Sequence, residues 1–297
     1  MYRGRFAPSP TGPLHAGSIF AALASYLDAR AQHGVWLVRI EDLDPPRESK
    51  EAAADILRTL EALGLTWDEQ VIYQSQRAAA YEEALARLDA RKLLYACNCS
   101  RQKLSSAGTV YPGWCRDHHI VRGSATALRC QVGDASISFI DRLQGEYSQQ
   151  LGRDIGDFIV HRRDGLFAYQ LAVVVDDAWQ GITDVVRGID LLDSTPRQIY
   201  LQGQLGYPVP RYAHVPIIIN AEGQKLGKQQ YARPIERTQP GQVLFRTLQA
   251  LRQHPVADLA TASTDEMLAW AIANWKPQNL AGIRDLPEFE GSASPAV

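Results

Sequence analysis

The spacing of apolar and polar residues predicts strands and helices that alternate along the first third of the chain. Residues 5–7 form a short apolar run, which ends where two prolines and Gly12 favour a turn. From His15, apolar side chains recur at helical spacing until Gly34. Residues 35–40 then predict a buried second strand, because the run is short and rich in β-branched side chains.

Two further helical patterns follow, at about residues 47–63 and 76–94. Strands that alternate with helices are typical of a parallel α/β sheet. The pattern changes at Tyr95, since residues 97–152 are rich in Cys, Gly, Pro and Ser and contain alternating runs such as residues 137–140. We therefore expect a β-rich insertion in an α/β domain.

The α/β pattern resumes after this insertion and continues through the last third of the chain. Residues 291–295 are polar and are expected to be frayed. The expected elements are the apolar runs 171–175 and 184–188, a helix over 195–205 that ends at Gly206, a strand over 215–219, and helices over 243–253 and 264–275.

Composition restricts the class of protein. The chain has 297 residues, of which 45% are hydrophobic and 22% charged, so it can bury a large core. No apolar run approaches the roughly 20 residues of a membrane helix, and the N-terminus lacks a signal-peptide core, so we expect a cytoplasmic protein. The formal net charge is -2, so a nucleic-acid partner would have to bind a local basic surface.

Residues 5–18 predict a nucleotide site. The free N–H groups at the start of a helix that follows a strand favour phosphate. His15 adds an imidazole donor, and Gly17 lets a flat ligand approach the backbone. The alternative is an ordinary strand-to-helix loop in which the histidine caps its own helix.

A second candidate is the pair Lys225 and Lys228 in the segment 224–229, which follows a predicted strand and turn. Two ammonium groups on a glycine-containing loop could bind the phosphates of ATP and stabilise charge on the leaving pyrophosphate. The alternative is a solvated basic turn.

These two segments resemble known motifs. Residues 8–17, Pro-Ser-Pro-Thr-Gly-Pro-Leu-His-Ala-Gly, resemble the nucleotide-binding signature of class I glutamyl- and glutaminyl-tRNA synthetases, with Ala16 in place of the usual Ile. Residues 224–229 resemble their lysine loop, with Gly227 where the glutamyl enzymes carry Ser. The resemblance implies ATP with Mg²⁺, His15 and Lys228 as catalytic residues, and ATP contacts from His15, Gly17, Lys225 and Lys228.

An acidic amino acid needs a cation for each carboxylate and an acceptor for its ammonium group, and guanidinium groups suit carboxylates. Arg5, Glu41, Tyr169 and Arg187 lie near predicted strand ends or in glycine-containing turns. Each could instead be a structural ion pair or a core tyrosine. The family resemblance implies that glutamate is bound by Arg5, Phe6, Ala7, Pro8, Ser9, Glu41, Tyr169 and Arg187.

Three clustered cysteines, Cys97, Cys99 and Cys115, favour a structural Zn²⁺ site over disulfides in a reducing compartment. On chemistry alone, His118 or His119 would be the fourth ligand, because imidazole binds Zn²⁺ more often than phenolate. The glutamyl-Q branch of the family instead implies Tyr111. The alternative is three unligated thiols, and Cys130 is expected to be a plain buried thiol.

The resemblance covers about the first 235 residues, and the rest is too short for the anticodon-binding domains of full glutamyl-tRNA synthetases. The short C-terminal part and the spacing of the cysteines together resemble the glutamyl-queuosine tRNA(Asp) synthetase family. That family activates L-glutamate with ATP and transfers it to the queuosine base of tRNA(Asp). The implied protein is a monomer with a Rossmann-like domain (1–94 and 181–235), a zinc-binding, acceptor-binding insertion (95–180) and a helical C-terminal segment (236–297).

Three alternatives remain at this point. The chain could be a short glutamyl-tRNA synthetase that charges the tRNA 3′ end, it could prefer glutamine, or it could bind nucleotide or tRNA without catalysis. The first differs only in the acceptor, and the second can be tested by pyrophosphate exchange. The histidine, glycine and lysine motifs disfavour the third.

Overall fold

Parallel strands form the centre of the computed structural model, which describes residues 1–105, 108–123, 125–226, 235 and 237–289. β1 pairs with β2 and β2 with β3, while β9 pairs with β10, all in parallel. The amide of Thr183 donates to the carbonyl of Arg3 at 2.9 Å, which places β9 beside β1. The five strands are β1 (Arg3–Phe6), β2 (Val35–Ile40), β3 (Ile72–Tyr73), β9 (Asp184–Gly188) and β10 (Arg211–Val215).

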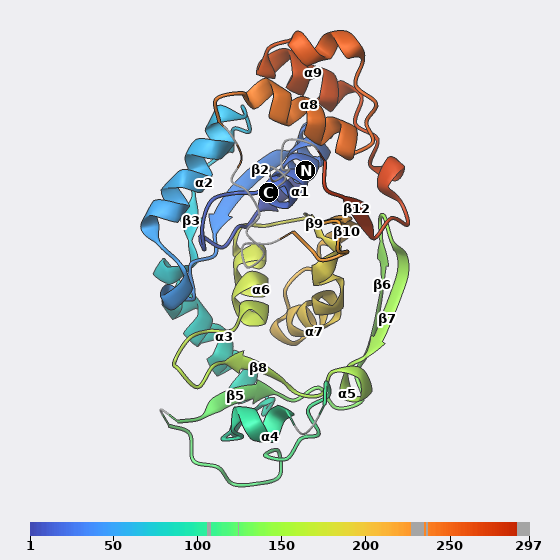
Figure 1. The fold of residues 1–297 in the computed structure, drawn as a ribbon. Coiled ribbons are helices and arrows are strands. Elements are labelled where there is room, and N and C mark those ends of the chain that lie inside the picture. The colour runs from blue at the N-terminus through green and yellow to red at the C-terminus, as the bar shows by residue number, and fades with distance from the viewer. Residues whose placement is uncertain (106–107, 124, 227–234, 236, 290–297) are drawn as a thin grey trace.

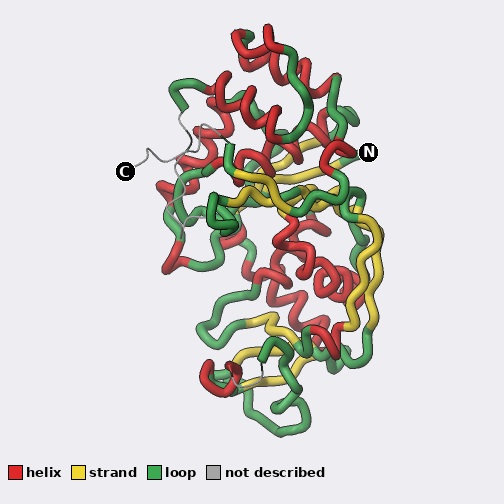
Figure 2. The backbone as a smooth tube through the Cα atoms, turned by 45° about the vertical axis from the view of Figure 1, so that its right-hand side comes forward, coloured by secondary structure: helices red, strands yellow, loops and turns green. Residues whose placement is uncertain are grey.

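Helices cover both faces of this sheet (Figures 1 and 2). On one face, Ile19 and Leu23 of α1 pack with Trp36 and Val38 of β2 in a continuous apolar core. On the other face, Ile199 of α7 packs in a smaller cluster with sheet residues. The helices are α1 (Ala16–Arg30), α8 (Pro240–Ala250) and α9 (Thr264–Ala273) on the first face, and α6 (Tyr169–Trp179) and α7 (Thr195–Leu205) on the second.

The β-rich character predicted for the segment after Tyr95 is confirmed, because it forms antiparallel structure at the far end of the molecule from α8 and α9 (Figure 1). One sheet has the order β4-β5-β8, and β6 and β7 form a long hairpin that returns towards the central sheet. Its elements are β4 (Leu94–Cys97), α4 (Arg101–Ser105), β5 (Ala127–Cys130), β6 (Ser136–Asp141), β7 (Gly145–Gln150), α5 (Leu151–Asp154) and β8 (Phe158–His161).

The strand that leads into the lysine segment has a partner from the end of the described chain. β11 (Ile217–Ile219) pairs in parallel with β12 (Asp285–Pro287). The remaining elements are η1 (Pro45–Arg47), α2 (Lys50–Ala62), η2 (Gln74–Gln76), α3 (Ala78–Ala90), η3 (Ile189–Ser194), η5 (Ala257–Thr261) and η6 (Pro277–Leu280).

Most predicted elements are confirmed, and the differences have local causes. Residues 171–175 lie inside helix α6. The predicted strand 215–219 spans the end of β10 and all of β11, and Pro216 separates them because it has no N–H to donate. The predicted helix 76–94 ends at Ala90, and Lys92 then adopts a φ of 58° before β4 begins.

Gly206 ends α7 in the left-handed conformation, with a φ of 68°, as its position after the helical pattern predicts. The polar segment 291–295 lies outside the described residues. Among the described residues, no helix is long and apolar enough to cross a membrane.

Candidate active site

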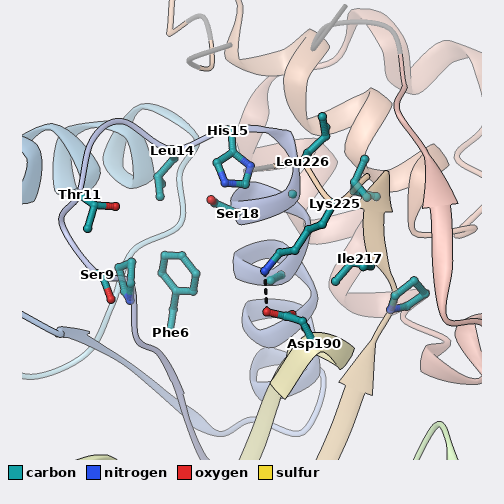
Figure 3. A pocket seen from close by; sticks show the side chains of 16 residues that line it. Phe6, Ser9, Thr11, Leu14, His15, Ser18, Asp190, Ile217, Lys225 and Leu226 are labelled. Atoms are coloured by element: carbon teal, nitrogen blue, oxygen red, sulfur yellow. Dashed lines mark hydrogen bonds and ion pairs between the residues drawn. The ribbon is translucent and has the colours of Figure 1, made fainter. Parts of the chain in front are cut away.

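A cavity of about 560 Å³ lies where the loop after β1 meets the start of α1, the end of β9 and β11 (Figure 3). The carboxyl ends of parallel strands are the usual position for ligands in such sheets. Its lining includes residues of the loop before α1 and the described residues of the lysine segment, the two segments that the sequence predicts to bind nucleotide. The residues are Phe6, Pro8, Ser9, Thr11, Leu14, His15, Gly17, Ser18, Ala21, Gly188, Asp190, Pro216, Ile217, Ile218, Lys225 and Leu226.

His15 occupies the N-cap position of α1, and its extended backbone places its carbonyl to accept from the amides of Ser18 and Ile19. Its imidazole lies directly over Gly17. A Cβ added at Gly17 would be 3.2 Å from His15 Cε1 and 3.3 Å from Nδ1. Glycine at this position therefore lets the imidazole approach the first turn of the helix, where backbone N–H groups and the helix dipole favour phosphate.

The lysine segment contributes one described ammonium group to the same cavity. Lys225 extends across the cavity, and its Nζ lies 2.5 Å from Asp190 Oδ2 (Figure 3). Gly227 and Lys228 lie outside the described residues.

A second cavity, of about 350 Å³, lies beside the first. Both are lined by Phe6, Ser9, Ala21 and Gly188. The two cavities are therefore direct neighbours. Apart from Pro8, which lines the larger cavity, every residue expected to bind glutamate lines the smaller one, which is formed by Arg5, Phe6, Ala7, Ser9, Ala21, Glu41, Tyr169, Val186, Arg187, Gly188 and Leu191.

Ion pairs fix the charged side chains on one side of this second cavity. Arg5 Nε donates to Asp177 Oδ1 at 3.1 Å. Arg39, which has no exposed surface, contacts Asp177 at 2.8 Å and Glu41 at 3.3 Å. Two guanidinium groups thus face two carboxylates, so this group is close to electrically balanced. Burial raises the pKa of Glu41 despite the opposing effect of Arg39 and Arg5.

Arg187 differs from these arginines, because its described hydrogen-bond partners are uncharged. It is 6% exposed, and its contacts are with His214, Thr195, the carbonyl of Leu191 and the Tyr169 hydroxyl. A buried guanidinium group without a carboxylate partner is costly. The smaller cavity therefore has a positive charge that an anionic ligand can neutralise.

The three predicted metal-binding cysteines converge at the other end of the molecule. Their sulfur atoms lie within 4.8 Å of one another, and Cys99 Sγ is 3.4 Å from Cys115 Sγ. The Tyr111 hydroxyl is 3.6 Å from Cys97 Sγ and 3.8 Å from Cys99 Sγ. Three thiols with a phenol oxygen are a donor set that fits a closed tetrahedral site.

The surroundings also suit a metal. Burial alone would raise the pKa of the Cys97 thiol, but hydrogen bonding from Arg129 and neighbouring groups lowers it to about 7. Burial and the neighbouring Cys115 raise the pKa of Cys99 to about 11, so a metal would have to displace that proton. His118 and His119 are exposed and are not among the side chains grouped with the three thiols. Cys130 is fully buried away from the group, in a different apolar cluster.

Sequence reasoning missed several residues of the site. Asp190 follows the end of a predicted strand, so the rule that selected Arg187 could have selected it. Asp177, Arg39 and His214 carry no such signal, because each lies within or directly beside a buried apolar run.

Comparison with known proteins relates the whole chain to synthetases. The family of class I tRNA synthetases (E and Q), catalytic domain, matches residues 1–110 and 116–252. A glutamyl-Q tRNA(Asp) synthetase of Ectopseudomonas mendocina is 54% identical over 294 residues, covering 97% of this chain and 98% of the relative. The enzyme of the same name from Pseudomonas aeruginosa PAO1 is 54% identical over 287 residues, with coverage of 97% and 98%.

Solved structures show the fold. A crystal structure of a glutamate tRNA ligase from Elizabethkingia meningosepticum, in complex with its amino acid, matches with a TM-score of 0.78 at 23% identity. The match covers 95% of this chain and 66% of that one, so this chain spans about two thirds of the ligase. The structure of a glutamate-tRNA synthetase from Elizabethkingia anophelis also matches, with a TM-score of 0.78 at 23% identity. That match covers 96% of this chain and 68% of the synthetase. The mixed α/β architecture described above is thus the class I synthetase fold.

Proposed function

The chain belongs to the glutamyl-Q tRNA(Asp) synthetases, within the class I tRNA synthetases of the E and Q type, and we propose which of its residues carry out their reaction. It is an ATP-dependent ligase that activates L-glutamate and transfers the glutamyl group to the queuosine base of tRNA(Asp). The residue assignment rests on the two adjacent cavities, of which one is lined by His15 and Lys225 and the other by Arg187.

In the first step, the α-carboxylate of glutamate attacks the α-phosphate of ATP, and pyrophosphate leaves. ATP occupies the larger cavity, with its phosphates near His15, the start of α1 and Lys225. The family resemblance implies that Lys228 also contacts the phosphates. Mg²⁺ bound with ATP supplies charge neutralisation at the phosphates. The chain contributes positioning and electrostatic stabilisation, and no covalent enzyme intermediate is required.

Glutamate occupies the smaller cavity. Arg187 and Arg5 bind its carboxylates, the Tyr169 hydroxyl accepts from Arg187 in the cavity wall, and Glu41 accepts from the ammonium group of glutamate. Because Arg5 and Arg39 are already balanced by Asp177 and Glu41, the unbalanced charge of Arg187 favours an amino acid with net charge -1. This supports glutamate over glutamine, whose side chain is uncharged.

In the second step, a hydroxyl of the cyclopentenediol of queuosine attacks the carbonyl carbon of glutamyl-adenylate, and AMP leaves. The acceptor is assigned by family membership. The full-length match to relatives with this name disfavours the alternative acceptor, the 3′ end of tRNA.

We further propose that Cys97, Cys99, Tyr111 and Cys115 hold one structural Zn²⁺. Two observations support this ligand set. The four donor atoms converge, and the apolar cluster around them is too small to stabilise this part of the chain by itself. We propose that residues 95–180 are the insertion between the catalytic halves 1–94 and 181–235, followed by a helical segment at 236–297. The proposed working form is a cytoplasmic monomer.

The test compares tRNA(Asp) with and without queuosine as acceptor of labelled glutamate, together with glutamate- and glutamine-dependent ATP–pyrophosphate exchange. We expect exchange with glutamate alone and labelling only of the queuosine-containing tRNA. Equal labelling of both tRNAs would point to the 3′ end, and exchange that required glutamine would contradict the proposed amino-acid pocket.

A further inference from the structure

Behind the substrate-facing side of Arg187 lies a histidine with no exposed surface, His214. The two residues are direct neighbours in the β9–β10 pairing, and Arg187 Nε lies 3.1 Å from His214 Nε2. On the other side of the ring, His214 Nδ1 lies 2.6 Å from Asp141 Oδ2. Asp141, His214 and Arg187 thus form a buried chain that ends at the smaller cavity.

The hydrogen bonds fix the tautomer of His214. Asp141 accepts from the backbone amides of Leu143, Gln144 and His214, at 2.9 to 3.1 Å, which favours the ionised carboxylate. An ionised carboxylate can only accept, so His214 Nδ1 carries the proton. Because Arg187 can only donate, Nε2 must be the accepting nitrogen of a neutral imidazole.

The charges around the ring agree with a neutral state. Burial lowers the pKa of His214, Arg187 lowers it further, and Asp141 and the more distant Asp190 only partly oppose them. Tyr212 stacks on the ring, with centroids 6.1 Å apart. The imidazole is therefore a fixed acceptor directed at Arg187.

Each of the three guanidinium nitrogens has a partner. Nε donates to His214, and Nη2 donates to Thr195 Oγ1 at 2.8 Å. Nη1 donates over a longer distance, 3.4 Å, to the hydroxyl of Tyr169, which lines the smaller cavity. Recognition of a carboxylate by arginine depends on the orientation of this planar group.

We infer that His214, held by Asp141, is a positioning residue that orients Arg187 for the substrate carboxylate and so sets the affinity for the acidic amino acid. The inference rests on the proposed function of the smaller cavity. Because Asp141 ends strand β6, the hairpin of the insertion supports the amino-acid pocket from behind. The sequence separation of 73 residues hides this link from local sequence patterns.

His214 Nε2 also lies 3.2 Å from the Thr195 hydroxyl. Two amide substitutions separate the contact of the ring with Asp141 from its contact with Arg187. The amide of His214→Gln reaches the position of Nε2, so its oxygen can still accept from Arg187. The amide of His214→Asn reaches only the position of Nδ1, so it keeps a partner for Asp141 and leaves Arg187 Nε without one. The two variants both carry an amide, but His214→Gln keeps the contact with Arg187 and His214→Asn keeps the contact with Asp141.

The readout is ATP–pyrophosphate exchange at varied glutamate and varied ATP. We expect His214→Asn to raise the KM for glutamate about tenfold or more, with the KM for ATP and the rate at saturating glutamate within about twofold of wild type. His214→Gln should restore the KM for glutamate to within about threefold. Equal effects of the two variants, or a loss that appears in the KM for ATP, would overturn the inference.

If both variants fail to fold, Thr195→Val tests the orientation of the guanidinium group of Arg187. The substitution removes, with little change in volume, the hydroxyl that accepts from Nη2 and also lies 3.2 Å from His214 Nε2. It should raise the KM for glutamate several-fold, and an unchanged KM would count against the inference. Failure of the proposed function is distinguishable, since wild-type protein would then show no glutamate-dependent exchange at all.

Discussion

Lys225 Nζ and Asp190 Oδ2 lie 2.5 Å apart in the larger cavity, so the lysine has an anionic partner within the protein. The triphosphate competes with this carboxylate for the ammonium group. Because a partly exposed ion pair contributes up to about 1 kcal/mol, Asp190→Asn should lower the KM for ATP by up to about fivefold. Lys225→Gln should raise it, as measured by pyrophosphate exchange at varied ATP. A higher KM in Asp190→Asn would show instead that Asp190 itself binds ATP.

Gly17→Ala should separate stability from activity. The added methyl would lie 3.2 to 3.3 Å from the His15 ring and displace it, so we expect a loss of about tenfold in exchange rate. The melting temperature should stay the same or rise, because alanine favours the helix over glycine by up to about 1 kcal/mol.

Gly203→Ala is the matched control, because Gly203 lies in helix α7 with no atom within 4 Å of an added Cβ. It should give the same stabilisation with full activity. Full activity in Gly17→Ala would remove the close His15 contact from the mechanism.

Glutamate affinity should depend on pH through Glu41. Burial raises the pKa of Glu41 above its ordinary value of 4.5, and only the ionised form binds the substrate ammonium group well. Lowering the pH through this pKa protonates Glu41, so the KM for glutamate should rise on the acid side and level off above the pKa. Glu41→Gln should raise the KM on the order of tenfold and flatten its acid-side dependence. An unaltered pH profile in Glu41→Gln would assign the titration to another group.

Zinc content should depend on Cys115 and not on Cys130, although both thiols are buried. We expect one zinc per chain in wild type and in Cys130→Ala, and little or none in Cys115→Ala, by atomic absorption. Chelation should lower the melting temperature and reduce transfer to tRNA more than pyrophosphate exchange, because none of the three cysteines lines either central cavity. Zinc retained by Cys115→Ala would contradict the proposed ligand set.

Lys228→Ala should reduce glutamate-dependent exchange by on the order of a hundredfold or more. The reason is loss of a positive charge that acts on the leaving pyrophosphate, the typical cost of removing one preorganised charge or donor. Lys276→Ala, a lysine elsewhere in the chain, serves as control. An unchanged rate in Lys228→Ala would remove that lysine from its assigned role.

Local sequence signals predict most of the elements. Arg5, Glu41 and Arg187 lie near predicted strand ends or in glycine-containing turns, and the fold brings them together around one cavity, while their role in binding glutamate stays a prediction from the family resemblance. The helix that carries Tyr169 was not distinguished, since residues 171–175 are a short apolar run compatible with either a strand or a buried helix.

The residues behind the site could not be predicted in this way. Asp177 lies on α6 and pairs with Arg5 across 172 positions of sequence, and Asp141 reaches His214 from a hairpin of the insertion. Such partners are set by tertiary packing, which buries a charge only where an opposite charge or a donor is available. Periodicity contains no information about which distant charge that will be.

The pairing of β11 with β12 has a consequence for synthesis of the enzyme. During translation, residues 217–219 emerge well before residues 285–287, so the strand leading to Lys225 has no parallel partner until nearly the whole described chain has been made. The nascent chain can thus form its first βαβ unit early, while the lysine segment gains its fixed support only near the end of translation. Catalytic competence should accordingly appear late in synthesis.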